Sequence, residues 1–385
     1  MGHKNTVFSQ LMKLVPRHEF EKQANKHHVG QRFRKVRRWD QFGALVLSQL
    51  SGKQSLRDIE ANLDIQEPLL YHSGMKKISK SSLARLNEQQ PAECFESLFY
   101  QMVNRFKSHR PKHRFRFNNP LYSMDASLID LSLKIFPWAD INGRGKAALK
   151  LHVGLNHGGY LPEFVSVTGG REPDVKAAEH MNFPKGSIIA MDKGYTSFDY
   201  YSLLNNKGNF FVTRLKKGIS YRTISTQKVS RNSGVISDKR IELCGEKGKN
   251  YTDLPLRRIH YHDETTGHHY EFLTNHLKLS AKTIALIYKD RWQVELFFKH
   301  IKQNLKIKSF LGKSLNALKS QIWVAMSVQL LLWYLKWSAR IAWSIQRMMR
   351  VLQVNLFMKY DLVELFVNAP PPDPGDIWIQ EAICL

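Results

Sequence analysis

Cysteine is scarce in this chain. Its 385 residues include only three cysteines (Cys94, Cys244 and Cys384), which lie far apart and match neither a disulfide framework nor the spacing of a zinc site. This usage is typical of a protein in a reducing compartment, so we expect a cytoplasmic location. The first ten residues also lack the apolar segment of a secretory signal.

Long hydrophobic runs are absent as well. The longest run, Ile322–Leu335, spans 14 residues and contains Gln329, whereas a membrane-spanning helix needs about 20 apolar residues. We therefore predict that this run forms a buried helix of a soluble protein and that the protein has no membrane partner.

Acidic residues are few compared with basic ones. The chain has 33 Asp and Glu against 58 Lys and Arg, which gives a formal net charge of +25. A hydrophobic content of 43%, with 11% aromatic residues, is sufficient for a folded core and excludes a disordered basic chain. The charge indicates a polyanionic partner, and the length predicts two or three domains.

The first 104 residues show the apolar periodicity of helices. Ser55 is expected to cap one short helix, and a second short helix is expected over Ser79–Gln90, after breaks at Pro68 and Gly74. Two short helices across a turn are typical of a helix-turn-helix that reads the major groove of DNA. An ordinary helical bundle with a basic face fits the same pattern, and both interpretations stay open.

Two segments are strongly basic and contain no acidic residue, Arg32–Arg38 and Arg105–Arg116. Such segments can contact DNA phosphates with little sequence preference. Because the second segment lies where the helical pattern ends, we assign residues 105–118 to a basic linker.

From Leu121 onward the periodicity is mainly that of strands, so the chain is predicted to be a multidomain α+β protein. Strands are expected at 121–133, at 149–155 and 160–167, which would pair around His157, at 187–191, and over most of 221–273, with a hairpin that turns at 264–267. Short helices are expected at 177–178 and 200–204, and one continuous helix from Ala281 to about Ile307.

This last helix carries an unusual polar stripe. At about 100° per residue, Tyr288, Arg291, Glu295 and Lys302 fall within about 60° of one another. An apolar stripe (Ile287, Val294, Phe298, Ile301 and Leu305) runs beside them, and Trp292 and Lys299 lie on the other flank. An amphipathic helix with incidental ion pairs is the alternative interpretation.

Two aspartates stand out in the strand region. Asp125 lies inside a strand, where a charge is costly unless it is used, and Asp192 ends an apolar strand at the edge where α/β sheets place their sites. With Glu295 they could form an oxygen cage for two divalent ions, because carboxylates are the ligands that such ions prefer. Two-metal sites serve phosphodiester chemistry.

The spacing Tyr288-x2-Arg291-x3-Glu295-x6-Lys302 resembles the Tyr–Arg–Glu–Lys signature of a large group of bacterial insertion-sequence transposases. These are DDE transposases with an RNase H-like catalytic core, and the resemblance extends over nearly the whole chain. It implies that Tyr288, Arg291 and Lys302 contact DNA phosphates near the transposon end.

The resemblance also implies the catalytic and metal-binding residues, which would be Asp125, Asp192 and Glu295 in a two-ion site for Mg²⁺, with Mn²⁺ as a substitute. It implies the following parts of the chain: a helical DNA-binding domain (1–104), the linker (105–118), the first part of an RNase H-like core (119–215), a β-rich insertion (216–275), the second part of the core with the glutamate helix (276–312), and a helical C-terminal region with a Pro-rich tail (313–385).

The function that this resemblance implies is metal-dependent cleavage at transposon ends, followed by strand transfer into target DNA. The partners would be the terminal inverted repeats, target DNA and a second copy of the chain, in a homodimer or larger synaptic complex associated with the bacterial nucleoid. No nucleotide cofactor is expected. A nuclease of the same fold without strand transfer, or a non-catalytic DNA-binding protein derived from a transposase, are the alternatives.

Weaker signals remain. Trp292 and the neighbouring Lys299 are expected to contact DNA, with Trp292 stacked on an extruded base, although a core tryptophan is the alternative. A histidine cluster near the hairpin (His260, His262, His268 and His269) lacks the spacing of a zinc site. The glycine-rich segment 142–146 lacks the context of a phosphate-binding loop.

Overall fold

The computed structural model describes residues 5–30, 35–52, 55–141, 146–230, 233–245, 248–305 and 310–367. The chain divides into two compact units. Unit 1 combines Met1–Pro111, Ile129–Ala148 and Phe298–Cys384, and unit 2 combines Lys112–Leu128 with Leu149–Phe297. The Pro-rich tail, most of the segment 142–146 and part of the segment Arg32–Arg38 lie outside the described residues.

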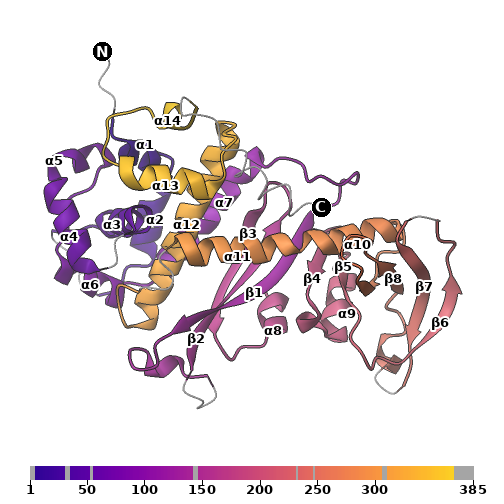
Figure 1. Cartoon of the computed structure of the whole chain (residues 1–385). Helices are drawn as coiled ribbons and strands as arrows, with labels where there is room; N and C mark the ends of the chain where they lie inside the picture. The colour runs from indigo at the N-terminus through magenta and orange to yellow at the C-terminus, as the bar shows by residue number, and fades with distance from the viewer. Residues whose placement is uncertain are drawn as a thin grey trace. The chain divides into compact units, whose positions relative to one another are not determined.

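Unit 1 is mainly helical, as the periodicity of the first 104 residues predicts. Its helices are α1 (Val7–Lys13), α2 (Arg17–Lys26), α3 (Arg38–Ser51), α4 (Leu56–Ile65), α5 (Glu67–Leu70), α6 (Lys80–Gln89), α7 (Glu93–Phe106), α12 (Leu315–Ser338), α13 (Ile345–Asn355) and α14 (Glu364–Val367) (Figure 1). The rings of Phe20, Trp39, Phe42 and Phe95 pack together in its core.

Local signals in unit 1 were predicted correctly. The side chain of Ser55 accepts a hydrogen bond from the backbone N–H of Asp58 and caps α4, which confirms the predicted N-cap. Gly74 has a φ of 68°, a left-handed conformation that glycine adopts without strain. The predicted buried helix at Ile322–Leu335 is confirmed as part of α12. No helix in the described ranges is long and apolar enough to cross a membrane.

Helix α7 runs further than the basic segment indicates. It ends at Phe106, so its last turn overlaps the start of the predicted linker 105–118. Phe106 is buried and its ring stacks on that of Tyr334, with 4.1 Å between the ring centroids. The burial of an aromatic ring therefore extends the helix into a segment whose charges alone favour a linker.

The strands form one mixed sheet of nine strands in the order β3-β2-β1-β4-β5-β9-β8-β7-β6. Strands β1 and β4, and β4 and β5, pair in parallel, whereas β2–β3 and β5–β9–β8–β7–β6 pair antiparallel. Their bounds are β1 (Leu121–Leu131), β2 (Ala147–Asn156), β3 (Leu161–Gly169), β4 (Ile188–Met191), β5 (Phe210–Arg214), β6 (Tyr221–Thr226), β7 (Val235–Leu243), β8 (Leu256–His262) and β9 (His269–Thr274). The predicted pairing around His157 and the predicted β8–β9 hairpin are both confirmed.

Helices cover both faces of the sheet in unit 2. The short helices α8 (Asp174–Glu179) and α9 (Phe198–Asn206) share a core with one face, which includes Tyr122 and Ile189. Helix α10 (Ala281–Asp290) packs on the other face (Figure 1). Leu121 and Ile188 belong to the core between this helix and the sheet. This alternation along β1 and β4 follows from the two-residue period of strands.

The prediction of one unbroken helix from Ala281 to about Ile307 is wrong at Arg291. Helix α10 ends at Asp290, and α11 (Trp292–Asn304) begins two residues later. At the junction the N–H of Arg291 donates to the carbonyl of Tyr288, and the N–H of Val294 donates to that of Arg291. These bonds span three residues instead of four and tighten the turn, so a uniform helical wheel does not describe it.

Candidate active site

The sheet register places Asp125 and Asp192 beside each other. In the parallel pair of β1 and β4, Leu121 lies opposite Ile188, and Ser123 lies opposite Ala190. Each aspartate follows two residues later on its own segment, so alternation directs both side chains to the face that α10 covers. Asp192 comes directly after the carboxyl end of β4, which is where α/β sheets commonly bind ligands.

Arg291 links two of the three predicted carboxylates. Its Nη2 lies 2.7 Å from Oε1 of Glu295, and its Nη1 lies 3.3 Å from Oδ2 of Asp125. Arg291 is only 7% exposed, so its charge-assisted bonds are partly shielded from solvent. The tight turn between α10 and α11 therefore carries the cation that joins the strand to the helix.

Asp192 has different partners. The hydroxyl of Tyr288 donates to its Oδ1 over 3.3 Å, and the Nη2 of Arg214 lies 3.8 Å from the same atom. The guanidinium groups of Arg214 and Arg291 lie over the ring of Tyr288, at 5.8 and 5.4 Å from its centroid. The ring of Tyr288 thus contacts both of the arginines that contact the carboxylates.

The charges of the site act on one another. Burial, together with the charges of Glu295 and Asp192, raises the pKa of Asp125 to about 6, although the Ala126 N–H and Arg291 partly oppose this rise. Burial lowers the pKa of Arg291, but its interactions with Tyr288, Glu295 and Asp125 together raise it above the ordinary value. Glu295 and Asp192 therefore lie close enough to Asp125 to repel its negative charge, and Arg291 compensates this repulsion only in part.

The chemistry of these side chains fits a divalent cation. They come from three separate elements and supply carboxylate oxygens, which Mg²⁺ prefers. In the described part of the chain no three His, Cys, Asp or Glu side chains form a cluster that could hold a metal ion in this arrangement. Arg291 lies between Asp125 and Glu295 and forms an ion pair with each of them. Its positive charge balances part of the negative charge of the site.

A pocket of about 390 Å³ lies beside the carboxylates in unit 2. Asp192, Tyr288, Arg291 and Glu295 line one part of it, and aromatic residues of the β8–β9 hairpin, among them Tyr261 and Tyr270, line another. Trp292 also lines the pocket and is 51% exposed. The alternative that Trp292 is a core residue is therefore wrong.

The predicted residues fall into two groups. Unit 2 brings together Asp125, Asp192, Glu295, Tyr288, Arg291 and Trp292. Lys299 and Lys302 belong to the part of α11 that lies in unit 1, where Lys299 is exposed and Lys302 is half-buried.

Sequence reasoning missed two residues near the carboxylates. Arg214 ends strand β5, which is parallel to β4, so its place at the carboxyl end of a parallel strand was a signal that could have found it. Tyr195 is buried and its hydroxyl has no hydrogen-bond partner among the described residues. Burial, with the charges of Asp174, Asp125 and Asp192, raises the pKa of Tyr195. No sequence signal marks this tyrosine.

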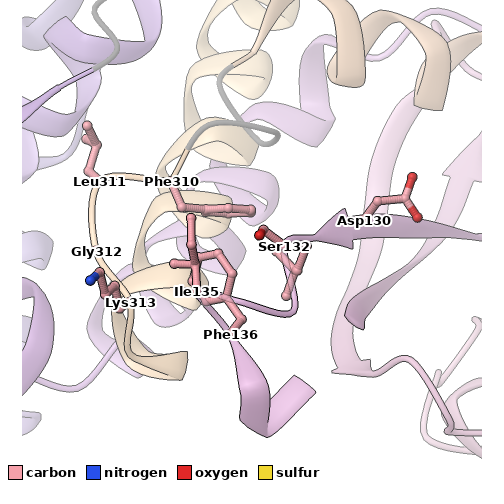
Figure 2. A pocket seen from close by; sticks show the side chains of 9 residues that line it. Asp130, Ser132, Ile135, Phe136, Phe310, Leu311, Gly312 and Lys313 are labelled. Carbon is pink, nitrogen blue, oxygen red and sulfur yellow. The ribbon is translucent and has the colours of Figure 1, made fainter. Parts of the chain in front are cut away.

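A second pocket, of about 400 Å³, lies in unit 1 and is shown in Figure 2. It is formed by the end of β1, the residues that follow it and the segment 310–313. The rings of Phe136 and Phe310 meet edge to face there, with 5.9 Å between their centroids (Figure 2). None of the predicted site residues lines this pocket, so it is separate from the candidate active site.

Comparison with known proteins gives matches to two family models. The model described as "Transposase DDE domain" matches residues 116–331, which include all of the predicted carboxylates. A model described as a domain of unknown function (DUF4372) matches residues 3–76. A solved structure, the piggyBac transposase synaptic complex with hairpin DNA, covers 98% of this chain and 83% of its own at 13% identity, with a TM-score of 0.44.

Among similar proteins, "Putative transposase y4zB" of Sinorhizobium fredii is 30% identical over 80% of this chain and 84% of its own length. "Probable transposase for insertion sequence element IS5377" of Geobacillus stearothermophilus is 24% identical over 68% of each chain. The DDE model covers more than half of the chain and agrees with the names of these relatives. The chain therefore belongs to the DDE transposase family of insertion sequences and has the function of a DNA transposase.

Proposed function

We propose that Asp125, Asp192 and Glu295 are the catalytic carboxylates with which this transposase cleaves the ends of its element and joins them to target DNA. DDE transposases generally use divalent metal ions, and we assign a two-ion Mg²⁺ site, with Mn²⁺ as a substitute, to these three residues. When bound, two such ions activate the attacking oxygen and stabilise the leaving oxygen of a phosphodiester. The observation that carries this assignment is the side-by-side register of the two aspartates, with Arg291 between Asp125 and Glu295.

The chain's own residues have separate tasks in this proposal. Arg291 keeps Asp125 and Glu295 at a fixed separation, and Tyr288 holds Asp192 through its hydroxyl. Their positive and polar groups, with Lys299 and Lys302 of α11, would contact the phosphates of the transposon end. Trp292 would stack on an exposed base, which its half-exposed ring at the pocket supports.

We also propose membership of the Tyr–Arg–Glu–Lys group and an RNase H-like core. The order of the first five strands, β3-β2-β1-β4-β5, with antiparallel β2–β3 and parallel β1–β4–β5, supports such a core. Strand β9 pairs with β5, so the proposed β-rich insertion (216–275) would extend the core sheet. The helical domain (1–104) and the basic linker (105–118) would bind DNA, and two or more copies would act at a synapse on the nucleoid.

The test is a cleavage and joining assay with the purified full chain. Linear DNA that carries the inverted repeats flanking the gene is incubated with Mg²⁺ and a supercoiled target plasmid. Wild-type protein should cut at the repeat ends and join them to the plasmid. Cleavage without joining would indicate a nuclease, and binding without cleavage would indicate a non-catalytic DNA-binding protein.

Alanine variants locate the site. Asp125→Ala, Asp192→Ala and Glu295→Ala should each abolish cleavage and leave DNA binding within a few-fold of wild type, because affinity depends mainly on basic residues. Asp130→Ala is the matched control, since Asp130 is an exposed aspartate on the same strand as Asp125. A variant of the three that keeps wild-type Mg²⁺-dependent cleavage would remove that position from the proposed site.

A further inference from the structure

A second set of polar contacts lies behind the carboxylates. Ser123 Oγ lies 2.6 Å from Nε2 of His157, and Nδ1 of the same ring lies 2.7 Å from Oδ2 of Asp290. The other carboxylate oxygen of Asp290 lies 2.9 Å from Nη2 of Arg114 and accepts a 3.4 Å hydrogen bond from the hydroxyl of Tyr160. All five residues belong to unit 2. Only Arg114 lies in a segment for which the sequence predicts a function, the basic segment Arg105–Arg116.

The protonation of this chain of contacts follows from its partners. A carboxylate can only accept hydrogen bonds. Nδ1 of His157 therefore carries a hydrogen and donates a hydrogen bond to Asp290. In the neutral ring Nε2 is then an acceptor, and the hydroxyl of Ser123 donates to it. Both ring nitrogens of His157, at the centre of this set of contacts, thus have hydrogen-bond partners. A buried polar network is stable only when its polar atoms are paired in this way.

The order Ser–His–Asp is that of serine hydrolases, but nucleophilic catalysis is excluded here. Ser123 is 0% exposed and lies on β1, between β2 and β4 in the sheet. His157 and Asp290 are also buried, so no substrate can reach the hydroxyl. A serine nucleophile must be accessible to its substrate.

The backbone around His157 is built to hold the ring in place. The N–H of His157 donates to the carbonyl of Leu121 at the start of β1, over 2.9 Å. Three residues later Tyr160 has a φ of 56°, a left-handed conformation that is costly for a residue other than glycine. Tyr160 keeps this conformation while its hydroxyl contacts Asp290, so the strain is maintained at a contact of the network.

The network ends one or two residues from the candidate active site at both sides. Ser123 precedes Asp125 by two residues and shares its face of β1. Asp290 is the last residue of α10 and directly precedes Arg291, which contacts Asp125 and Glu295. Strand β1 and the junction of α10 and α11 are thus joined twice, once through Arg291 and once through the buried network.

We propose that Ser123, His157, Tyr160, Asp290 and Arg114 form a positioning network that fixes the separation of Asp125 from Arg291 and Glu295, so that the carboxylates can take up a divalent ion. The inference rests on the proposed function. Residues that orient metal ligands from behind commonly change metal affinity or activity by about 10- to 100-fold when they are replaced. Ser123, His157 and Asp290 are buried, so they would act from the interior and touch neither DNA nor metal, whereas Arg114 reaches the surface.

The test compares Asp290→Asn with Asp238→Asn in the full chain. Asp238 is equally buried, in an ion pair with Arg257 at 2.6 Å in the same unit, so both variants remove a buried negative charge that faces an arginine. Both should unfold at a lower temperature than wild type. In thermal melts without DNA, only Asp290→Asn should need at least about 10-fold more Mg²⁺ than wild type for the same stabilisation. Only this variant should cleave DNA about 10- to 100-fold more slowly than wild type.

A second pair keeps the test decisive if Asp290→Asn does not fold. Ser123→Ala removes one buried hydroxyl and leaves Nε2 of His157 unpaired, whereas Ser187→Ala removes a buried hydroxyl that donates over 2.6 Å to the carbonyl of Pro184. Only Ser123→Ala should raise the Mg²⁺ requirement, by less than Asp290→Asn. Wild-type Mg²⁺ dependence in folded Ser123→Ala and Asp290→Asn, or equal shifts in the two controls, would overturn the inference. Wild-type protein that does not cleave at all would contradict the proposed function itself.

Discussion

Asp125 is a carboxyl group that folding favours in its neutral form. Burial and the neighbouring carboxylates of Glu295 and Asp192 raise its pKa from 3.8 to about 6. Between these pH values the folded chain keeps a proton that the unfolded chain has released, so stability is lost as the pH rises through this window. The free energy involved is roughly 3 kcal/mol at most.

This leads to a prediction for Asp125→Asn, which resembles the neutral acid in shape. In metal-free buffer containing EDTA, the variant should be more stable than wild type at pH 7.5, by up to roughly 3 kcal/mol, and little different at pH 4.5. Denaturant unfolding at the two pH values measures the difference. Asp130→Asn, an exposed aspartate on the same strand, should show no such pH dependence. An equal gain for Asp125→Asn at both pH values would mean that the raised pKa is not the cause.

Arg291 contacts two carboxylates through two different nitrogens. A lysine has the same charge but one ammonium group, which cannot reproduce the planar fork. Arg291→Lys should therefore lower the rate of cleavage by about 10- to 100-fold while the protein stays folded. Arg222→Lys is the control, because Arg222 also makes a two-nitrogen contact, with Glu242, but on the exposed surface. Wild-type cleavage by Arg291→Lys would show that charge alone suffices at this position.

At the scale of elements, helix α11 combines a buried seam with exposed cations. Val294 and Ile301 are fully buried, whereas Lys299 is exposed and Lys302 is half-buried. Because the seam supports the fold, we expect the lysine variants to stay folded. Their proposed task is to bind phosphates.

Lys299→Ala and Lys302→Ala should each weaken binding to the transposon end. Each should also make the slope of log K against log salt shallower by about one, because one phosphate contact is lost. Equilibrium binding at four or five salt concentrations gives this slope. Lys282→Ala, which removes an exposed lysine of α10, should leave the slope for end-specific binding closer to that of wild type. If both α11 variants bind like wild type at every salt concentration, the two lysines do not contact DNA.

The elements also show what the sequence could predict. Alternation along 121–125 and 188–192 was sufficient to predict that each aspartate ends or interrupts a strand, because strand periodicity is local. That β1 and β4 pair in register was not predictable, since pairing between distant segments depends on the whole sheet. The break at Arg291 was missed because a helical wheel assumes uniform geometry, whereas the N–H groups of Arg291 and Val294 form hydrogen bonds that span only three residues.

The network of Ser123, His157 and Asp290 illustrates the same limit. Each residue is ordinary in its local sequence, and only the fold brings them within hydrogen-bonding distance across gaps of 34 and 133 residues. The spacing of Tyr288, Arg291, Glu295 and Lys302 can be read from the sequence because these residues lie within one short segment. A buried network made from three distant segments has no such signature.

At the scale of the whole molecule, the net charge of +25 predicts that DNA affinity depends strongly on salt. A protein that neutralises several phosphates releases their counterions, so its affinity falls as the salt concentration rises. In a plot of log K against log salt, the slope steepens by about 0.9 for each phosphate contacted. The basic residues of the segment 105–116 provide a place to test this. Lys112 and Arg116 are exposed, whereas Arg114 is paired with Asp290.

We predict that non-specific binding of the full chain to duplex DNA weakens by at least about 10³-fold between 50 and 200 mM salt. Replacing Lys112 and Arg116 together by glutamine should lower the log–log slope by about two, because two phosphate contacts are lost. Arg114→Gln should lower the slope less, since that guanidinium already neutralises Asp290, but it should slow cleavage through the positioning network. Fluorescence anisotropy across a salt series, run beside the cleavage assay, separates the two effects. A flat slope for wild type would mean that the surplus basic residues are solvated and do not contact DNA. Equal slopes for wild type and both variants would mean that the segment 105–116 is not part of the DNA-binding surface.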